Sequence, residues 1–452
     1  MNLISVLPYR TDLRARERSQ HAGFSLIELM VAITLGILLS IGIVTLFGAT
    51  STTNNVQDAL ARLQENGRYA VTRITDDLRM GSGQYCGSST SQGWTTSTND
   101  GPIYPGLTVL SNANGVSTGA SGSFPDSGGL LGTLPGPGST YPVGPANFMQ
   151  GYDCATGGGC TPAVPAGTPP NGFPAEGLGD GLRVTGADML TIRYQRGTGW
   201  NFTVDTSAPP HVILAPTIIG GQSMDDPVNF QNNDRALLLT CGGGQVFQVT
   251  AAGNNLTPTG LLNSSNYKPS ATVGSFDVRV FNFSRDFLTV TYYLAYKADP
   301  DTAGRLIPTL YRRQNGTQVD ELVQGVERLD FIYGVQYKDA SLHYLTANQV
   351  NANSTSANCS PASPGLGLTA PNVEAGCLWR SVMSIEVHLL LDTVDNIALS
   401  PSDMAYRYTG ATGDTTMHVP PAPNQPMDTG MLAGLMMRRE FISSVAMRNG
   451  NH

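Results

Sequence analysis

The longest apolar stretch of the chain runs from Phe24 to Ala49 and contains a single charged residue, Glu28. Folded as a helix, these residues would be ~39 Å long, which is enough to cross a bilayer. No second stretch of this kind follows. The pattern therefore predicts one membrane-spanning helix near the N-terminus, followed by a large polar region.

After this stretch the pattern becomes amphipathic. Small or apolar residues recur at steps of three and four residues, while the polar positions between them carry charges, including Asp76 and Asp77. The members of this stripe are Val56, Leu60, Leu63, Gly67, Ala70, Ile74 and Leu78. Such spacing places one face of a helix against a core, and Gly81 and Gly83 are stop signals. We expect one continuous helix over Phe24–Arg79.

From Leu182 onward, short runs rich in β-branched and aromatic residues are bounded by Gly, Pro, Asn or Asp, which is typical of strands and turns. The expected strands are Leu182–Val184, Met189–Tyr194, Ala236–Thr240, Gln245–Thr250, Phe287–Ala295, Thr309–Arg313, Leu329–Val335, Val382–Leu391 and Glu440–Met447. Asn315-Gly316 is a hairpin-turn signal, and Glu321–Val326 is expected to form a short helical turn. The fold class is therefore α+β, with a long helix packed on a β-rich head.

The composition adds a loop-rich region and limits the class of protein. The chain has 452 residues, 52 glycines, 29 prolines and a net charge of −8. Residues 81–180 contain no Lys or Arg and are dominated by Gly, Ser, Thr and Pro, which predicts long surface loops with about two short strands. The acidic balance disfavours a chain that binds nucleic acid over its whole surface and leaves a local basic patch open; no direct nucleic-acid site is identified. The mean hydropathy of −0.10 excludes a protein with many membrane spans.

The residues around the apolar stretch set its orientation. Arg10, Arg14, Arg16 and Arg18 precede it, and basic residues beside a first span stay in the cytoplasm, so the head is expected to be exported. A cleaved secretory signal and a plain N-terminal anchor are two alternatives. Neither gives a reason for a carboxylate within the apolar run, where it costs several kcal/mol unless it is paired.

The segment from Gly23 to Ile33, GFSLIELMVAI, resembles the type III signal of type IV prepilins. The resemblance implies that prepilin peptidase cleaves between Gly23 and Phe24 and that the new N-terminal Phe24 is methylated. Glu28 then becomes the fifth residue of the mature chain, where it can pair with the Phe24 ammonium of its own or a neighbouring subunit. A Glu that merely lies at the membrane edge remains the alternative for Glu28.

Later blocks, TYYL, LYRR, ELVQGVERLDFIYGV, SVMSIEVHLLL and RREFISSVAMRN, are similar to the PilW family of minor type IV pilins. The resemblance implies a pilin-like fold and a role in a low-copy tip or priming complex, in pilus assembly, twitching motility, adhesion or DNA uptake. The implied partners are prepilin peptidase, other minor pilins, the major pilin, the inner-membrane assembly platform, and membrane lipid through residues 24–49. The implied location is the inner membrane, with a cytoplasmic N-terminus and a periplasmic head, and then the pilus at the cell surface.

Two other functions stay open: a J-type pseudopilin of type II secretion, and a membrane-anchored adhesin that never polymerises. The expected regions are a cleaved leader (1–23), the membrane or filament-core half of the helix (24–49), its amphipathic half (50–80), the Gly-rich loops (81–180) and the head (181–452).

Six cysteines lie in the exported part, where disulfides persist. Six cysteines allow 15 connectivities. Proximity along the chain favours Cys154–Cys160 and Cys359–Cys377, which leaves Cys86–Cys241.

Catalysis and metal binding find little support in the sequence. The six histidines are isolated, and no nucleophile or nucleotide-binding motif occurs in context. His388, in an apolar strand, is expected to be structural. Asp299-Pro300-Asp301 could form a calcium loop but is expected to be a β-turn. We expect no cofactor, no metal and no enzymatic activity.

Overall fold

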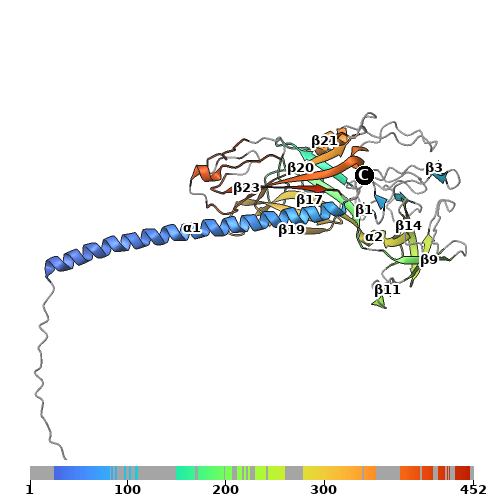
Figure 1. The fold of residues 1–452 in the computed structure, drawn as a ribbon, viewed down its shortest axis with the longest axis horizontal. Helices are drawn as coiled ribbons and strands as arrows, with labels where there is room; N and C mark the ends of the chain where they lie inside the picture. Colours follow the sequence, from blue (N-terminus) through green and yellow to red (C-terminus); the bar gives the residue numbers. More distant parts are fainter. Residues whose placement is uncertain are drawn as a thin grey trace, which may run out of the picture. The chain divides into compact units, whose positions relative to one another are not determined.

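The computed structural model describes most of the helix and of the head. The described residues are 25–81, 83–84, 87–88, 96–97, 101–102, 107–109, 149–167, 172–197, 199–205, 211–215, 218–219, 222–223, 230–240, 243–259, 278–337, 341–352, 377–397, 400–410, 416–422, 425, 427 and 433–447. The α+β prediction is confirmed, because one long apolar helix accompanies a β-rich head (Figure 1).

The N-terminal helix α1 runs without a break over Leu26–Met80, within two residues of the predicted bounds. Its first part, up to Gln57, forms a unit by itself, and its second part belongs to the head. In the second part the buried residues include Leu63, Gly67, Ala70, Ile74 and Leu78, all members of the predicted stripe. Asp77 is buried as well, so its expected place on the polar face is wrong, whereas its neighbour Asp76 is exposed.

The head contains a six-stranded and a four-stranded antiparallel sheet. The first has the order β19 (Gln318–Gln324), β18 (Leu306–Gln314), β17 (Phe287–Ala298), β8 (Met189–Gln195), β6 (Met149–Cys154) and β7 (Cys160–Thr161). The second has the order β21 (Leu342–Leu345), β20 (Val326–Gln336), β22 (Val382–Asp392) and β23 (Arg438–Ala446). The predicted hairpin is confirmed, since Asn315 and Gly316 adopt positive φ in the turn between β18 and β19.

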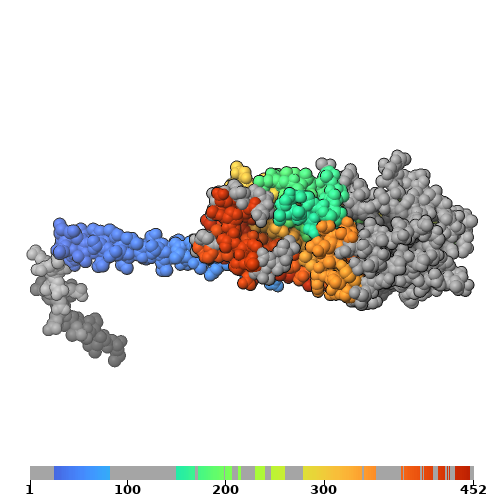
Figure 2. Space-filling model, turned by 90° about the horizontal axis from the view of Figure 1, so that it is seen from above, coloured from blue at the N-terminus to red at the C-terminus, as the bar shows by residue number. Residues whose placement is uncertain are grey.

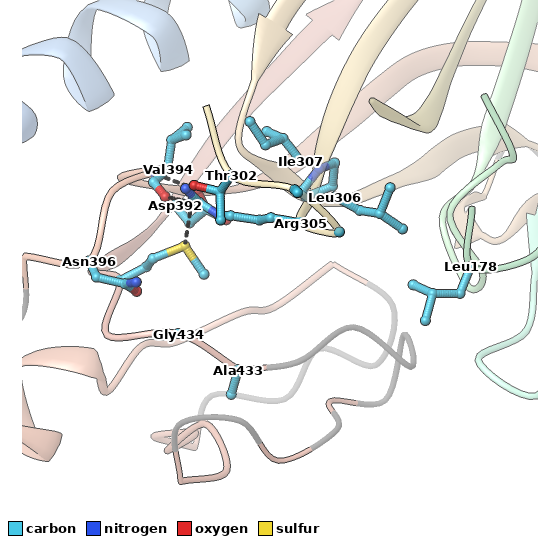
Figure 3. A pocket seen from close by; sticks show the side chains of 14 residues that line it. Leu178, Thr302, Arg305, Leu306, Ile307, Asp392, Val394, Asn396, Ala433 and Gly434 are labelled. Carbon is cyan, nitrogen blue, oxygen red and sulfur yellow. Dashed lines mark hydrogen bonds between the residues drawn. The ribbon is translucent and has the colours of Figure 1, made fainter. Parts of the chain in front are cut away.

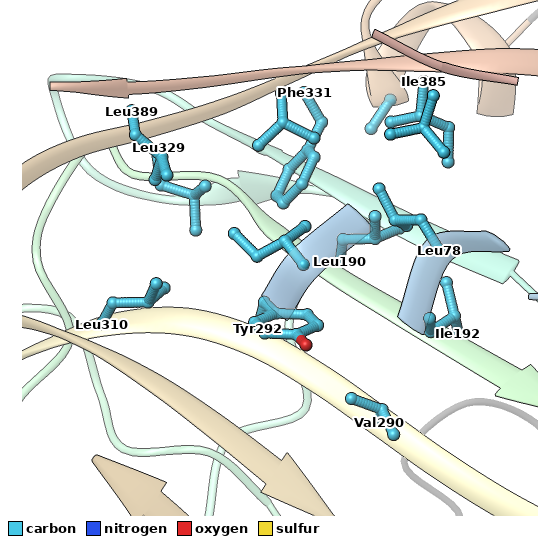
Figure 4. Packing of buried hydrophobic residues seen from close by; sticks show 14 of the residues in the cluster. Leu78, Leu190, Ile192, Val290, Tyr292, Leu310, Leu329, Phe331, Ile385 and Leu389 are labelled. Atoms are coloured by element: carbon cyan, nitrogen blue, oxygen red, sulfur yellow. The ribbon is translucent and has the colours of Figure 1, made fainter. Parts of the chain in front are cut away.

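Both sheets and α1 contribute to one apolar core (Figure 4). Leu190 and Tyr292 from the first sheet, Phe331 and Leu389 from the second, and Leu78 from the helix are each fully buried. The helix is therefore held by the same core that joins the two sheets.

A third antiparallel sheet lies between β8 and β17 in the sequence. Its order is β16 (Val278–Asn282), β13 (Arg235–Thr240), β14 (Gly243–Ala252), β15 (Asn255–Thr259), β10 (His211–Ala215) and β9 (Asn201–Asp205), and β5 (Leu107–Val109) pairs in parallel with β14. Three two-stranded ribbons are also present: β1 (Gly83–Gln84) with β2 (Gly87–Ser88), β3 (Thr96–Ser97) with β4 (Gly101–Pro102), and β11 (Ile218–Ile219) with β12 (Gln222–Ser223).

Short helices complete the described part. These are α2 (Phe283–Asp286), α3 (Ala347–Ala352), η4 (Cys377–Ser381) and η5 (Pro401–Met404).

Three sequence predictions are corrected by this arrangement. The helical turn expected at Glu321–Val326 is wrong, because those residues belong to strands β19 and β20, joined at Gly325, which has φ +78°. The strand expected at Leu182–Val184 is reduced to isolated bridges at Arg183. The loop-rich region, expected to be mostly surface loops, contributes β6 and the edge strand β7 to one end of the first sheet.

Candidate assembly site

The predicted cleavage and methylation residues, Gly23 and Phe24, lie outside the described residues. Glu28 lies in the first turn of α1 and is exposed. The helix has begun before it, since the Leu29 amide donates a hydrogen bond to the Ser25 carbonyl at 3.1 Å. A carboxylate in a first turn interacts favourably with the unpaired amides of a helix N-terminus.

The apolar part of α1, Leu26–Phe47, is not covered by other described side chains of the chain, and we call it the bare part of α1. Every residue from Leu26 to Phe47 is exposed, and Leu26 and Phe47 expose 75% and 76% of their surfaces (Figure 2). The most apolar stretch of α1 has a mean hydropathy of 2.6, and none of it is buried. Because soluble proteins rarely expose a continuous apolar patch of this size, this surface is suited to lipid or to other apolar helices.

Six hydroxyl groups in the first part of α1, up to Thr53, are satisfied within the helix itself. Each donates a hydrogen bond of 2.8–3.0 Å to a backbone carbonyl three or four residues earlier; the donors are Thr34, Ser40, Thr45, Thr50, Thr52 and Thr53. Such bonds hide hydroxyls that would be costly to bury unpaired in an apolar medium.

A buried ion pair attaches the C-terminal end of α1 to the head. The Asp77 carboxylate accepts a hydrogen bond from Arg312 Nε at 2.7 Å, and the two side chains are 7% and 3% exposed. The same carboxylate accepts hydrogen bonds from the hydroxyls of Tyr194, at 2.9 Å, and Tyr292, at 2.5 Å. We call Asp77, Arg312, Tyr194 and Tyr292 the helix clamp.

The helix clamp is electrostatically consistent. Burial, and then the nearby charge of Asp77, raise the pKa of Tyr194 and Tyr292, so both hydroxyls stay protonated and can donate. Burial alone would lower the pKa of Arg312, but its hydrogen bond to Asp77 and the charge of that carboxylate outweigh burial and raise it. The guanidinium is therefore charged whenever the carboxylate is.

Close packing accompanies the clamp two to three turns earlier in α1. A Cβ atom placed on Gly67 would lie 2.3 Å from the Phe441 ring of β23. The predicted stripe position Gly67 thus brings the helix backbone against the edge of the four-stranded sheet, which a larger residue would prevent.

The cysteine predictions have different outcomes. The Cys154–Cys160 disulfide is confirmed and joins β6 to β7. Cys86, Cys241 and Cys359 lie outside the described residues, and of the Cys377 side chain nothing is described. These two pairings therefore stay predictions.

The predicted non-catalytic residues have partners within the head. His388 Nδ1 lies 3.0 Å from the Glu440 carboxylate, in a buried group that also includes Thr409. The Asp299 carboxylate accepts the Asp301 amide at 2.9 Å and pairs with Arg305 at 3.0 Å, as in a turn. The hydrogen bond from the Asp301 backbone, and also the Arg305 charge, lower the pKa of Asp299.

Beside this turn lies a cavity of about 470 Å³ (Figure 3). Leu306, Ile307 and Val394 give it apolar walls, and Arg305 crosses it to donate a hydrogen bond to the Val394 carbonyl and to touch Met436 Sδ at 3.9 Å. The Arg305 guanidinium therefore links the β17–β18 turn to the segments after β22 across this cavity.

The clamp residues Asp77 and Arg312 were not predicted from the sequence. Their one signal is that Asp77 lies one position before Leu78, a member of the stripe, so a slightly wider buried face would have included it. No local pattern indicates that its partner is more than 200 residues away.

Two family models match the chain. The N-terminal methylation motif of prokaryotes matches residues 18–44, and the Type IV Pilus-assembly protein W family matches residues 291–449. No curated protein and no solved structure is significantly similar to the chain. The second match covers both partners of the central β20–β22 pair and the edge strand that contacts Gly67, while the first covers Glu28 and most of the bare part of α1. Residues 291–449 of the chain therefore match the PilW family of type IV pilus-assembly proteins, and its N-terminal region matches the prepilin methylation motif.

Proposed function

We propose that the chain is a minor pilin, anchored in the inner membrane by α1 and then built into a type IV pilus, in its tip or priming complex. Prepilin peptidase removes residues 1–23, Phe24 is methylated, and the assembly platform brings the helix beside those of other minor pilins and the major pilin. The protein acts as a structural subunit and not as an enzyme, and its roles in twitching motility, adhesion and DNA uptake follow from incorporation.

The observation that carries this proposal is the bare apolar part of α1 with Glu28 alone in its first turn. An anchor in lipid needs the apolar surface but no carboxylate, whereas a stack of helices can pair the carboxylate with a neighbour's N-terminal ammonium. At an effective dielectric constant of about 20, two charges 4 Å apart attract by roughly 4 kcal/mol. Desolvation offsets part of that, and a net of about 1.4 kcal/mol already changes an equilibrium tenfold.

The test is the amount of subunit in sheared pili relative to the amount in membranes. We expect Glu28→Ala to be cleaved and inserted like the wild type, and its incorporation to fall about tenfold. Glu65→Ala is the matched control, because it removes an exposed carboxylate from the same helix outside the bare part. Gly23→Glu should leave the uncleaved precursor in the membrane, since the peptidase accepts only a small residue there.

Equal incorporation of Glu28→Ala and wild type at equal membrane levels would contradict the pairing role. A chain that is cleaved but never found in pili would instead favour the secretion pseudopilin or the adhesin that does not polymerise.

A further inference from the structure

The third sheet of the head interrupts a hairpin. Strands β8 and β17 are antiparallel neighbours, and Gln195 at the end of β8 lies opposite Phe287 at the start of β17. The chain leaves and re-enters the head at adjacent points, since the Arg196 amide donates to the Asp286 carbonyl at 2.8 Å. A segment with such close ends can be inserted or removed without displacing the strands that flank it.

Between these ends the sheet closes on itself. Its two outer strands, β9 and β16, meet at Trp200 and Val280, which exchange backbone hydrogen bonds of 2.8 and 3.1 Å. The order β16-β13-β14-β15-β10-β9 then returns to β16, so the six strands form a barrel. Closure satisfies the backbone groups of edge strands that would otherwise need another partner.

The barrel has a core of its own, separate from the core that holds α1. Its inward residues include Val212, Phe247, Val249, Leu256 and Val280, each 0% exposed. These side chains come only from the barrel strands, while the core around α1 contains none of them. A cluster with its own buried apolar surface can remain folded when the neighbouring one does not.

Among the described residues, one buried cluster joins barrel and head. Leu237, Leu239, Val246 and Phe281 of the barrel pack with Phe283 and Phe287 at the connection, and the Phe283 and Phe287 rings stack with centroids 4.7 Å apart. Within the described part of the chain, β5 is the strand from outside this insertion that pairs with the barrel, over three residues.

We propose that residues 197–285 form an inserted domain that folds separately from the pilin head and that incorporation into a pilus does not require. The helix clamp, the core around α1 and the bare part of α1 all lie outside it. The family match begins at residue 291 and so covers neither this domain nor β6 and β8 of the head. Because the assembly elements lie outside the domain, it is available for a task other than assembly.

The first test removes the domain from the full chain. Deleting residues 197–285 and changing Arg196→Asn and Asp286→Gly leaves a two-residue turn of the kind that favours a β-hairpin. Phe287→Thr is added, because the other members of the junction cluster are deleted with the domain. We expect membrane levels and pilus incorporation within about twofold of the wild type. Loss of the variant from the membrane, or from pili at equal membrane levels, would overturn the proposal.

The second test keeps the chain intact and measures hydrogen exchange by mass spectrometry. Val249→Asp places a carboxylate in the barrel core, and Val290→Asp does the same in the core around α1; both positions are 0% exposed. We expect Val249→Asp to raise exchange at least about 100-fold in the barrel strands β13–β15, while β17 and β22 keep their protection. Equal loss of protection in β22 would mean that barrel and head unfold as one, which would overturn the proposal. Val290→Asp, which should expose β17 and β22, shows that the measurement detects unfolding of the head.

Discussion

Asp77→Ala should destabilise the head strongly, because it removes the buried carboxylate that pairs with Arg312 at 2.7 Å and leaves this guanidinium only the more exposed Asp320, at 3.7 Å. Removing one partner of a buried ion pair typically costs about 3–5 kcal/mol. The Tyr194 hydroxyl loses its acceptor in the same change, while the Tyr292 hydroxyl keeps the Arg73 carbonyl at 3.1 Å, so we expect a loss within this range. With a urea dependence of about 3 kcal/mol per molar for a protein of this size, the unfolding midpoint should fall by roughly 1–1.7 M.

The assay is urea unfolding of the mature full-length protein in detergent micelles, followed by tyrosine and tryptophan fluorescence. The matched control is Asp76→Ala, which removes the neighbouring carboxylate; its pair with Arg79, 3.4 Å long and half exposed, should cost less than about 1 kcal/mol. Adding Arg312→Met to Asp77→Ala removes the buried positive charge as well and should recover part of the loss. If Asp77→Ala and Asp76→Ala have equal midpoints, the clamp does not hold the helix to the head.

Two further predictions concern the packing and the pH dependence of the head. Gly67→Ala should lower the free energy of unfolding by about 1–3 kcal/mol, because the new methyl group clashes with the Phe441 ring. In a Phe441→Ala background the same change should be neutral or stabilise by up to about 1 kcal/mol, because Ala favours a helix. A loss of stability in both backgrounds, measured by urea unfolding, would contradict this reasoning. Burial, and then the charge of Asp330, raise the pKa of Asp188 well above 3.8, so the folded protein holds a proton that the unfolded chain has released. The free energy of unfolding should therefore fall as pH rises from about 3.8 toward this raised pKa, by up to about 1.4 kcal/mol per pH unit. Asp188→Asn should make the free energy of unfolding less dependent on pH in this range. An unchanged slope in the variant would mean that other groups cause the pH dependence.

The helix and most of its buried face could be predicted from the sequence, because a period of three and four residues is a local signal. Leu63, Gly67, Ala70, Ile74 and Leu78 follow that period and are buried. The partner of a buried charge is not a local property. Asp77 contacts Arg312 only because the fold brings β18 next to α1. No spacing in the sequence predicts that these two elements are neighbours.

The head illustrates the same limit. Strands such as β17 and β22 were predicted from their β-branched and aromatic residues, since one sheet face selects those residues wherever the strand pairs. Closure of the barrel depends on the bridge between Trp200 and Val280. These residues are far apart in the chain, and no repeated sequence pattern marks them as partners. The prepilin motif could be recognised from the sequence, because a carboxylate within an apolar run is energetically costly and is visible without knowledge of the fold.

The hydroxyls along the first part of α1 have a consequence for transport of the subunit. Since Thr34, Ser40 and Thr45 already donate to carbonyls of their own helix, none of them needs a partner from the surroundings. If the subunit passes from a bilayer to a filament, the helix exchanges one set of dispersion contacts for another and breaks no hydrogen bond along this part. The transfer is then close to isoenergetic along most of the helix, which leaves Glu28, at its beginning, as the group that can tell the two environments apart.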